Sequence, residues 1–335
     1  MSKKIIWWGL GLIALLGVFL FALKQPAPES INIQNNKTEP EIVRVGYREH
    51  GLYWPLFLGL EKGFFEKENI IVEKISFTST NQMMEALIAG QIDASLGGVN
   101  TTLLATLETK SSGEFKIFTI SNETVKKYFS AILVKADSNI IDIKQLENKK
   151  VSTQPGSTTK FLFKKVVNDK IAPDEAQLEQ MNADLQLSSL ESGQTDAAIV
   201  FEPTATIGVN LGIAKILEKA LWSNDIMNNG PVTASVLSKQ FLSDKPEVAR
   251  SFVQAVENTI IYGENNEHEV QSAIAMYTPL TIDIAKQIPV LNSQLLSEID
   301  ILQLQNFFDL LFAEGEIKTK VNAADMILPT YVKNK

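Results

Sequence analysis

The pattern of hydrophobic and polar residues from Ile42 onward predicts a succession of strands and helices. Alternating runs at 42–47 and 71–77 indicate strands, while 53–70 and 81–90 carry apolar residues at helical spacing. A further buried run, at 92–97, begins the next strand. Strands that alternate with helices in this way are typical of an α/β fold, in which helices cover a largely parallel sheet.

A second round of the same pattern follows, and the chain then ends in helices. Long β-type runs at 128–136 and 230–238 bracket this second round. After them, apolar residues recur at helical spacing in four stretches, Pro246–Glu264, Glu267–Tyr277, Ile282–Ile288 and Leu295–Phe312. We therefore expect two α/β units and a helical C-terminal region.

One short motif occurs twice. Gly-Gln-x-Asp-Ala begins at Gly90 and again at Gly193, each time between a helical stretch and a buried run. Glycine suits the left-handed conformation at a helix C-terminus, and an aspartate at the start of a strand can accept hydrogen bonds from the amides of the turn. The repeat predicts the same helix–turn–strand unit in each of two lobes.

The N-terminus predicts a membrane anchor. Lys3 and Lys4 precede nineteen uncharged, mostly apolar residues, Ile5–Leu23, a length that suits a transmembrane helix. The flanking lysines place Met1 in the cytoplasm and the chain after the anchor on the outer side. We prefer an uncleaved anchor at 1–23 to a cleaved signal peptide, because the cleavage sites after it are weak, and we expect a polar tether at 24–41.

Composition argues against several classes of function. The 335 residues carry a net charge of −8 and no run of Lys or Arg longer than two, so we expect no nucleic-acid partner. The chain has no cysteine, which excludes disulfides, thiolate zinc sites and thiol catalysis. Because no catalytic or phosphate-loop motif stands out either, we expect no enzyme, no cofactor and no metal site.

Five loops are candidates for a ligand cleft, because ligands of open α/β sheets lie beyond the carboxyl ends of the strands. These loops follow predicted strands, at 47–54, 78–81, 97–102, 154–159 and 201–204. The residues that we predict to contact a ligand are Tyr47, Arg48, His50, Trp54, Thr80, Asn81, Asn100, Thr101, Gly156, Ser157, Thr158 and Glu202.

The loop at 154–159 carries the strongest signal. A Pro-Gly turn precedes Ser157 and Thr158 at a predicted helix start, where free amides and hydroxyls can hold a carboxylate, sulfonate or phosphate. Asn100 and Thr101 would face this loop from the other lobe. The alternative is ordinary helix capping, which uses the same residue types.

The other candidate side chains point to two kinds of ligand. Arg48 can pair with an anion or lie in solvent. Glu202 favours an amine or aminopyrimidine, or it caps the helix that follows it. Tyr47 and Trp54 can stack on a flat ligand or pack between helix and sheet, and His50 lies in the candidate cleft.

Several segments, taken in order, carry a family resemblance. "VRVGY", "GFFEKENI", "LIAGQIDASLGG" and "LESGQTDAAIVFEPTAT" resemble the substrate-binding proteins of ABC importers of the nitrate/sulfonate/taurine type, over about Ile42 to Tyr331. The resemblance implies an α/β periplasmic-binding-protein type II clamshell, with two lobes, a two-strand hinge and a helical C-terminal region. Lobe 1 would comprise 42–130 and 237–335, lobe 2 would comprise 131–236, and Phe129–Val134 and Val232–Val236 would cross the hinge.

The resemblance also implies a function. We expect an extracytoplasmic, membrane-tethered monomer that captures a small, anionic solute of the sulfonate, nitrate or taurine kind and passes it to an ABC permease. A binder of a thiamine-precursor pyrimidine or similar aromatic amine is the alternative ligand class, and a membrane-tethered ligand sensor is the alternative function. A related pyrimidine synthase carries a cysteine-rich motif that this chain lacks, which argues against an enzyme.

Overall fold

The computed structural model describes residues 39–171 and 175–329, which belong to one compact unit that begins at Pro40. The expected membrane anchor at 1–23 and nearly all of the tether lie outside the described residues. Within the two described ranges, no helix is long and apolar enough to cross a membrane. The anchor therefore stays a prediction.

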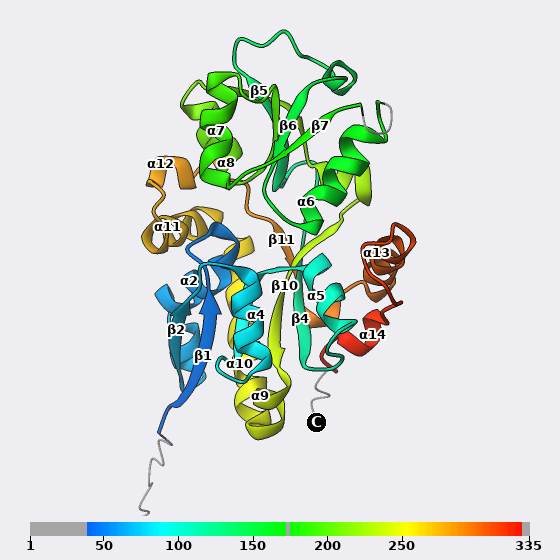
Figure 1. The fold of residues 1–335 in the computed structure, drawn as a ribbon. Helices are drawn as coiled ribbons and strands as arrows, with labels where there is room; N and C mark the ends of the chain where they lie inside the picture. The colour runs from blue at the N-terminus through cyan, green and yellow to red at the C-terminus, as the bar shows by residue number, and fades with distance from the viewer. Residues whose placement is uncertain (1–38, 172–174, 330–335) are drawn as a thin grey trace, which may run out of the picture. The chain divides into compact units, whose positions relative to one another are not determined.

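The compact unit contains two sheets. The larger sheet has the strand order β11-β4-β10-β3-β1-β2 (Figure 1). Its strands are β1 (Glu41–Tyr47), β2 (Ile70–Ser76), β3 (Ala94–Asn100), β4 (Phe115–Asn122), β10 (Pro231–Ser238) and β11 (Asn292–Gln294). β1 runs parallel to β2 and β3, whereas β10 and β11 pair antiparallel with their neighbours.

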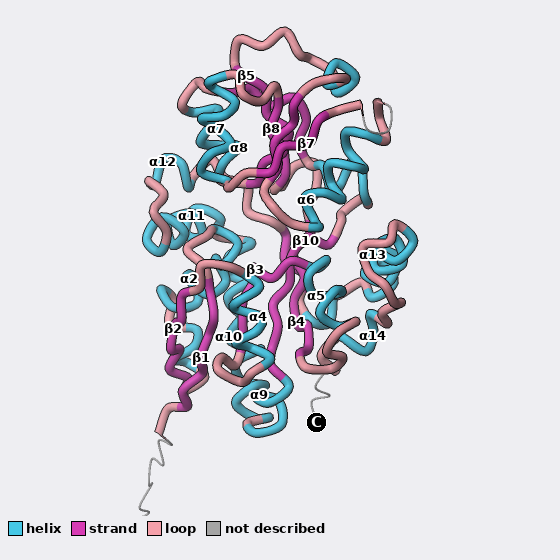
Figure 2. Tube along the Cα trace, viewed as in Figure 1, coloured by secondary structure: helices cyan, strands magenta, loops and turns pink. Residues whose placement is uncertain are grey.

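The smaller sheet has the order β7-β6-β8-β5-β9 and lies above the larger one in the tube view (Figure 2). Its strands are β5 (Ser130–Lys135), β6 (Lys150–Thr153), β7 (Gln177–Gln180), β8 (Ala197–Phe201) and β9 (Ala214–Lys219). β6 pairs in parallel with β7 and β8, and β5 pairs antiparallel with β8 and β9. Both sheets thus join parallel strands to one or more antiparallel strands.

The chain crosses between the sheets twice. The first crossing, 123–129, joins β4 to β5, and the second, 220–230, joins β9 to β10. The β runs that we expected to cross the hinge lie within β5 and β10, so the crossings come just before them. The division into two lobes stays a prediction. Because β10 pairs with β3 and β4 of the larger sheet, the second boundary between the proposed lobes fits better near residue 230 than at 236.

Helices cover both sheets (Figures 1 and 2). The helices around the larger sheet are η1 (Gly51–Tyr53), α2 (Trp54–Glu61), α3 (Phe64–Lys67), α4 (Thr80–Ile88), α5 (Thr101–Glu108), α9 (Lys239–Asp244), α10 (Pro246–Glu264), α11 (Glu267–Tyr277), α12 (Ile282–Ala285), η5 (Leu296–Glu298), α13 (Ile301–Ala313) and α14 (Ala323–Met326). Those that follow the first crossing are η2 (Ile143–Leu146), α6 (Ser157–Leu162), η3 (Phe163–Asn168), α7 (Ala183–Ser192), α8 (Thr204–Asn210) and η4 (Trp222–Ile226).

The C-terminal helices agree with the sequence in part. α10 and α11 have the expected bounds, but the stretch from 295 to 312 is divided into the short helix η5 (Leu296–Glu298) and α13, which begins at Ile301. The side chain of Asp300 accepts a hydrogen bond from the Gln303 amide at 2.9 Å and so caps α13 at that point. Asn292–Gln294, just before this stretch, is the short strand β11, which pairs with β4.

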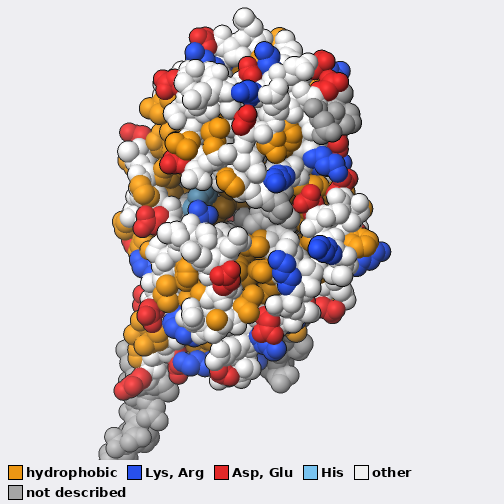
Figure 3. Space-filling model, in the orientation of Figure 1, with side chains coloured by type: hydrophobic (Ala, Val, Ile, Leu, Met, Phe, Trp, Pro, Cys, Tyr) orange, Lys and Arg blue, Asp and Glu red, His pale blue; other side chains and the backbone are white. Residues whose placement is uncertain are grey.

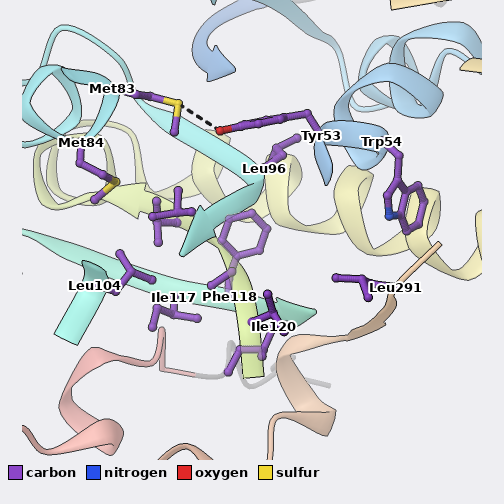
Figure 4. Close-up of a cluster of buried hydrophobic side chains, with 14 of the residues drawn as sticks. Tyr53, Trp54, Met83, Met84, Leu96, Leu104, Ile117, Phe118, Ile120 and Leu291 are labelled. Atoms are coloured by element: carbon purple, nitrogen blue, oxygen red, sulfur yellow. Dashed lines mark hydrogen bonds between the residues drawn. The ribbon is translucent and has the colours of Figure 1, made fainter. Parts of the chain in front are cut away.

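The core of the larger-sheet half packs large apolar side chains between sheet and helices. Tyr53 is buried against Met83, and its hydroxyl lies 3.8 Å from the Met83 sulfur (Figure 4). The Tyr53 ring also requires the glycine at position 98, since a Cβ there would lie 2.1 Å from the ring. This packing fixes η1 and α2 against β3, and η1 directly follows the loop that carries Arg48 and His50.

The repeated motif forms the same structure twice. Gly90 and Gly193 have φ angles of 69° and 74°, the left-handed conformation expected of a glycine that ends a helix. Three residues on, the aspartate accepts a hydrogen bond from a neighbouring parallel strand, β1 in one copy and β6 in the other. Asp93 Oδ2 accepts from the Arg44 amide at 2.8 Å, and Asp196 Oδ2 accepts from the Lys150 amide at 2.9 Å.

The partner of each aspartate differs from our expectation. We expected the amides of the turn to be the donors, but the amide of the neighbouring parallel strand donates instead, and the aspartate's own amide donates back to that residue's carbonyl at 2.8 Å in both copies. Asp93 is additionally bound by the Arg44 guanidinium at 2.6 Å and 3.1 Å. Asp196 has only the more distant Lys149, at 3.7 Å.

We predict that Asp93→Ala destabilises the protein by about 3 kcal/mol and Asp196→Ala by about 1 kcal/mol. Asp93 is nearly buried and accepts charge-assisted bonds, which contribute roughly 1.5–3 kcal/mol each, whereas Asp196 loses one amide bond and an exposed pair. Urea denaturation followed by circular dichroism measures both free energies of unfolding. Equal losses in the two variants would contradict this account.

Candidate ligand-binding site

A cavity of about 270 Å³ lies between the two sheets, next to both crossings. Figure 3 shows the hollow that leads to it, with a histidine and a basic side chain visible inside. The larger-sheet half contributes Arg48, His50, Leu52, Tyr53, Thr80, Gly98, Asn100, Val232 and Thr233. The smaller-sheet half and the crossings contribute Phe129, Gln154, Ala183, Phe201, Glu202, Pro203, Thr204 and Trp222.

Two further hollows adjoin this inner cavity. A more open one, of about 530 Å³, shares Thr80, Asn100, Gln154 and Phe201 with it and forms its mouth. A pocket of only about 20 Å³ shares His50, Phe129 and Glu202 and extends toward α11. The inner cavity is slightly smaller than typical pockets for drug-sized ligands, so it suits a solute of few atoms.

The five candidate loops converge on this region, but they do not contribute equally. Five predicted residues line the inner cavity: Arg48, His50, Thr80, Asn100 and Glu202. Three more line the mouth, namely Asn81, Gly156 and Thr158. Ser157 begins α6, and its side chain lies outside the described part of the structure.

The remaining three predicted residues have packing roles. Thr101 is fully buried, and its hydroxyl donates to the Pro231 carbonyl at 2.7 Å. The Tyr47 ring packs edge-on against Phe57, with ring centroids 5.9 Å apart. Trp54 is 4% exposed and borders the smallest pocket, where it lies near Leu291 (Figure 4).

At the mouth of the cavity, polar side chains that we expected to bind an anion form helix caps and hydrogen bonds within the protein. The Asn100 side chain accepts from the Leu103 amide at 3.1 Å and caps α5. The Thr158 hydroxyl donates to the same Asn100 oxygen at 3.5 Å, which bridges the two halves. The capping alternative therefore holds for Asn100, and the loop at 154–159 lies outside the inner cavity except for Gln154.

Aromatic side chains form the inner wall. Phe129 and Phe201 stack with centroids 5.0 Å apart and an interplanar angle of 12°, and His50 meets Phe129 edge-on at 6.1 Å. Trp222 packs edge-on against Phe307 of α13 at 5.5 Å. Our sequence predictions omitted Phe129, Phe201 and Trp222. Phe201 lies in a loop that we did select, whereas no motif marks Phe129 or Trp222.

Two ionisable groups of the lining, His50 and Glu202, have pKa values shifted toward their neutral forms. Burial, together with the positive charge of Arg48, lowers the pKa of His50 to about 4. Its Nδ1 accepts from the Leu52 amide at 3.2 Å, an interaction that requires an unprotonated nitrogen. Burial raises the pKa of Glu202, although hydrogen bonds from Thr206 and Tyr128 oppose this shift.

Several polar atoms of the lining have no partner within residues 39–171 and 175–329. The indole Nε1 of Trp222 and the hydroxyl of Thr233 are buried without a hydrogen bond, and Arg48 forms no ion pair. Glu202 uses Oε2 to accept from the Thr206 amide at 3.1 Å, while Oε1 accepts no bond. Buried polar groups are nearly always satisfied in folded proteins, so these atoms are exceptional among the residues that line the cavity.

No group of three or more His, Asp or Glu side chains within the described ranges could hold a metal ion. The lining residues offer hydrogen bonding and charge. Arg48, Trp222 and Thr233 can donate to an anion, and Glu202 can accept from an amine. None of these groups is arranged as a nucleophile with an adjacent base.

The arrangement of two sheets around a cavity is that of periplasmic binding proteins. The periplasmic aliphatic sulphonate binding protein SsuA from Escherichia coli has the same fold, with a TM-score of 0.71 and 17% identity over 88% of this chain and 95% of its own. Residues 36–276 match the model of the NMT1-like family, so this chain belongs to that family.

Two further relatives bear on what this fold can do. A "Putative aliphatic sulfonates-binding protein" of Bacillus subtilis (strain 168) is 26% identical over 301 residues, which cover 87% of each chain. The desulfurization enzyme DSZB also shares the fold, with a TM-score of 0.66 and 14% identity over 86% of this chain and 96% of its own. The fold therefore hosts both binding proteins and an enzyme, and only the site can distinguish them.

We predict that His50 makes stability depend on pH in the acid range. The unfolded chain takes up a proton at His50 near its ordinary pKa of 6.5, whereas the folded protein does so only near 4. Stability from this group is therefore complete above pH 6.5 and is lost as the pH falls toward 4, by about 3 kcal/mol. Urea denaturation at several pH values should show a smaller loss for His50→Asn, which keeps an acceptor for the Leu52 amide.

The second histidine provides a matched control. His268 is exposed on α11, so His268→Asn should keep the pH dependence of the unmodified protein. Buried carboxyl groups such as Glu202 change stability with pH in all three proteins alike and cancel in the comparison. If His50→Asn and His268→Asn give the same pH profile, the neutral buried state of His50 is wrong.

Proposed function

We propose that this chain is the extracytoplasmic solute-binding protein of an ABC importer and that it captures a small anion, of the sulfonate kind, between its two halves. The observation that carries the proposal is one cavity lined by Arg48, which forms no ion pair within the described ranges, and by Trp222 and Thr233, whose Nε1 and Oγ1 atoms have no hydrogen-bond partner there. A bound sulfonate offers three acceptor oxygens, one for each donor. The sulfonate-binding names of two relatives support this ligand class.

The proposal places the anion deeper than the sequence suggested. The loop at 154–159 lines the mouth, where the Thr159 hydroxyl already donates to Gln154 and Gly156 carbonyls at 2.6 Å and 3.0 Å. Arg48 is the basic residue that lines the inner cavity. A buried charge-assisted bond is stronger than an exposed one, which favours the inner position.

One observation favours a second ligand class. Glu202 is 2% exposed and presents an oxygen that accepts no bond from any described residue. An amine or aminopyrimidine would supply that bond. A taurine-like solute, which carries a sulfonate and an ammonium group, would satisfy both Arg48 and Glu202.

The cellular setting belongs to the same proposal. The apolar segment Ile5–Leu23 would tether the binding unit to the outer face of the membrane, where a permease of the importer would receive the solute. We propose a monomer, because the site is complete within one chain. Binding without turnover is expected, since the lining holds no activated nucleophile.

We predict that ethanesulfonate binds the full chain in mild detergent and raises its melting temperature with concentration. Thr233→Val should weaken this binding about tenfold, because a buried hydroxyl bond to a charged group contributes roughly 1.5 kcal/mol. Isothermal titration calorimetry measures the affinity, with nitrate, taurine and an aminopyrimidine as further probes.

Thr101→Val is the matched control for this prediction. Thr101 is also buried, but its hydroxyl already bonds to the backbone of β10, so this variant should lose stability while its affinity stays within about twofold. An aminopyrimidine that binds while ethanesulfonate does not would replace the anion by the amine ligand. If none of the four probes binds, the proposed function is wrong.

A further inference from the structure

The carboxylate of Glu123 lies at the start of the first crossing, directly after β4. Its side chain is fully buried, with 0% exposure. Oε1 accepts from the amides of Phe129 and Ser130, both at 3.0 Å, and Oε2 accepts from the Trp222 amide at 3.2 Å. The Ser130 hydroxyl lies within 2.9 Å of both oxygens.

These bonds join the two crossings to each other. Phe129 ends the first crossing, and Trp222 lies early in the second. The Ser130 hydroxyl also accepts from the Leu221 amide at 3.0 Å, and the Ala220 amide donates to the Ser130 carbonyl at 2.9 Å. Glu123 is therefore the acceptor around which two segments almost a hundred residues apart are held.

Both segments present an aromatic side chain to the candidate cavity. Phe129 and Trp222 are part of its lining, whereas Glu123 is not. The carboxylate binds the backbone amides of these two residues. It therefore fixes the backbone from which their rings extend, without lining the cavity itself. The indole Nε1 of Trp222, a proposed donor to the solute, belongs to the residue whose backbone amide Glu123 binds.

The burial of this carboxyl group is energetically unfavourable. Burial raises the pKa of Glu123 to about 7, although three amides and a hydroxyl oppose the shift. No ion pair to a Lys or Arg within the described ranges offsets the cost. A buried ionisable group without a counter-charge lowers the stability of the folded protein. This cost suggests that Glu123 has a role beyond joining two segments.

We propose that Glu123 is a positioning residue for solute binding: its carboxylate holds Phe129 and Trp222, one on each crossing, in the arrangement that forms the inner wall of the cavity. The inference rests on the proposed function, since it assigns Glu123 to the site where the solute would bind. It adds a residue that never touches the solute but determines where two of its contacts lie.

The first test compares Glu123→Gln with Glu257→Gln in the full chain, purified in dodecyl maltoside. Glutamine keeps the shape of Glu123 but turns an NH₂ group toward amides that need an acceptor. Glu257 is the control, because its Oε1 also accepts a backbone amide, that of Leu296 at 3.1 Å, and neither residue lines the cavity. Calorimetry with ethanesulfonate should show about tenfold weaker binding for Glu123→Gln and a change within about twofold for Glu257→Gln.

The second test needs no solute. The sequence has four tryptophans, and labelling with 5-fluorotryptophan gives each a fluorine resonance, of which Trp222→Phe identifies one. The Trp222 resonance should shift in Glu123→Gln. Ser130→Ala, which removes only the hydroxyl, should shift it in the same sense and serves if Glu123→Gln fails to fold.

The outcomes separate this inference from the proposed function. An unmodified chain that binds none of the four probes contradicts the proposed function, and the Trp222 resonance alone then decides the positioning role. A Trp222 resonance unchanged in both Glu123→Gln and Ser130→Ala overturns the inference. Equal losses of affinity in Glu123→Gln and Glu257→Gln also overturn it, because they would reflect stability rather than the cavity wall.

Discussion

The chain must pass twice between its two sheets, and the buried Glu123 carboxylate is where both passages meet. Segments that leave a sheet lose the regular partners of their amides, and a buried amide without an acceptor is costly. Glu123 supplies acceptors to Phe129, Ser130 and Trp222 at once. The rings of Phe129 and Trp222 then complete the cavity wall, with Phe129 stacked on Phe201. The shape of the candidate site thus depends on the hydrogen bonds of Glu123, a residue that does not itself line the cavity.

Much of the fold was predictable because local patterns carry it. The helix bounds of α10 and α11 follow from apolar spacing and a proline at the helix start, and the two Gly-Gln-x-Asp-Ala units form the same structure. The errors arise where distant segments pair. The donor to Asp93 is the Arg44 amide on the next strand rather than the turn, and β11 exists only because β4 offers it an edge. A single sequence gives no local signal for either contact.

The candidate site was likewise predictable only in part from the sequence. The rule that ligands lie beyond the carboxyl ends of strands selected the loops that bring Arg48, His50 and Glu202 to one cavity. It could not select Trp222 or Thr233, because the first lies on a crossing and the second on an antiparallel strand. Their proximity to Arg48 follows from tertiary packing, which leaves no spacing in the sequence.

Contacts that join the two halves outside the crossings differ in kind from the contacts at the crossings. Glu314, after α13, binds Lys164 at 2.7 Å and Lys165 at 3.1 Å, and the Asn210 side chain donates to Gln287 at 3.0 Å. The Lys164 side chain is 50% exposed, and exposed pairs of this kind contribute little because water and salt compete for them. The Glu123 bonds are buried and have no such competitor. The two halves are therefore joined by weak, partly exposed contacts outside the crossings and by the buried Glu123 bonds at the crossings.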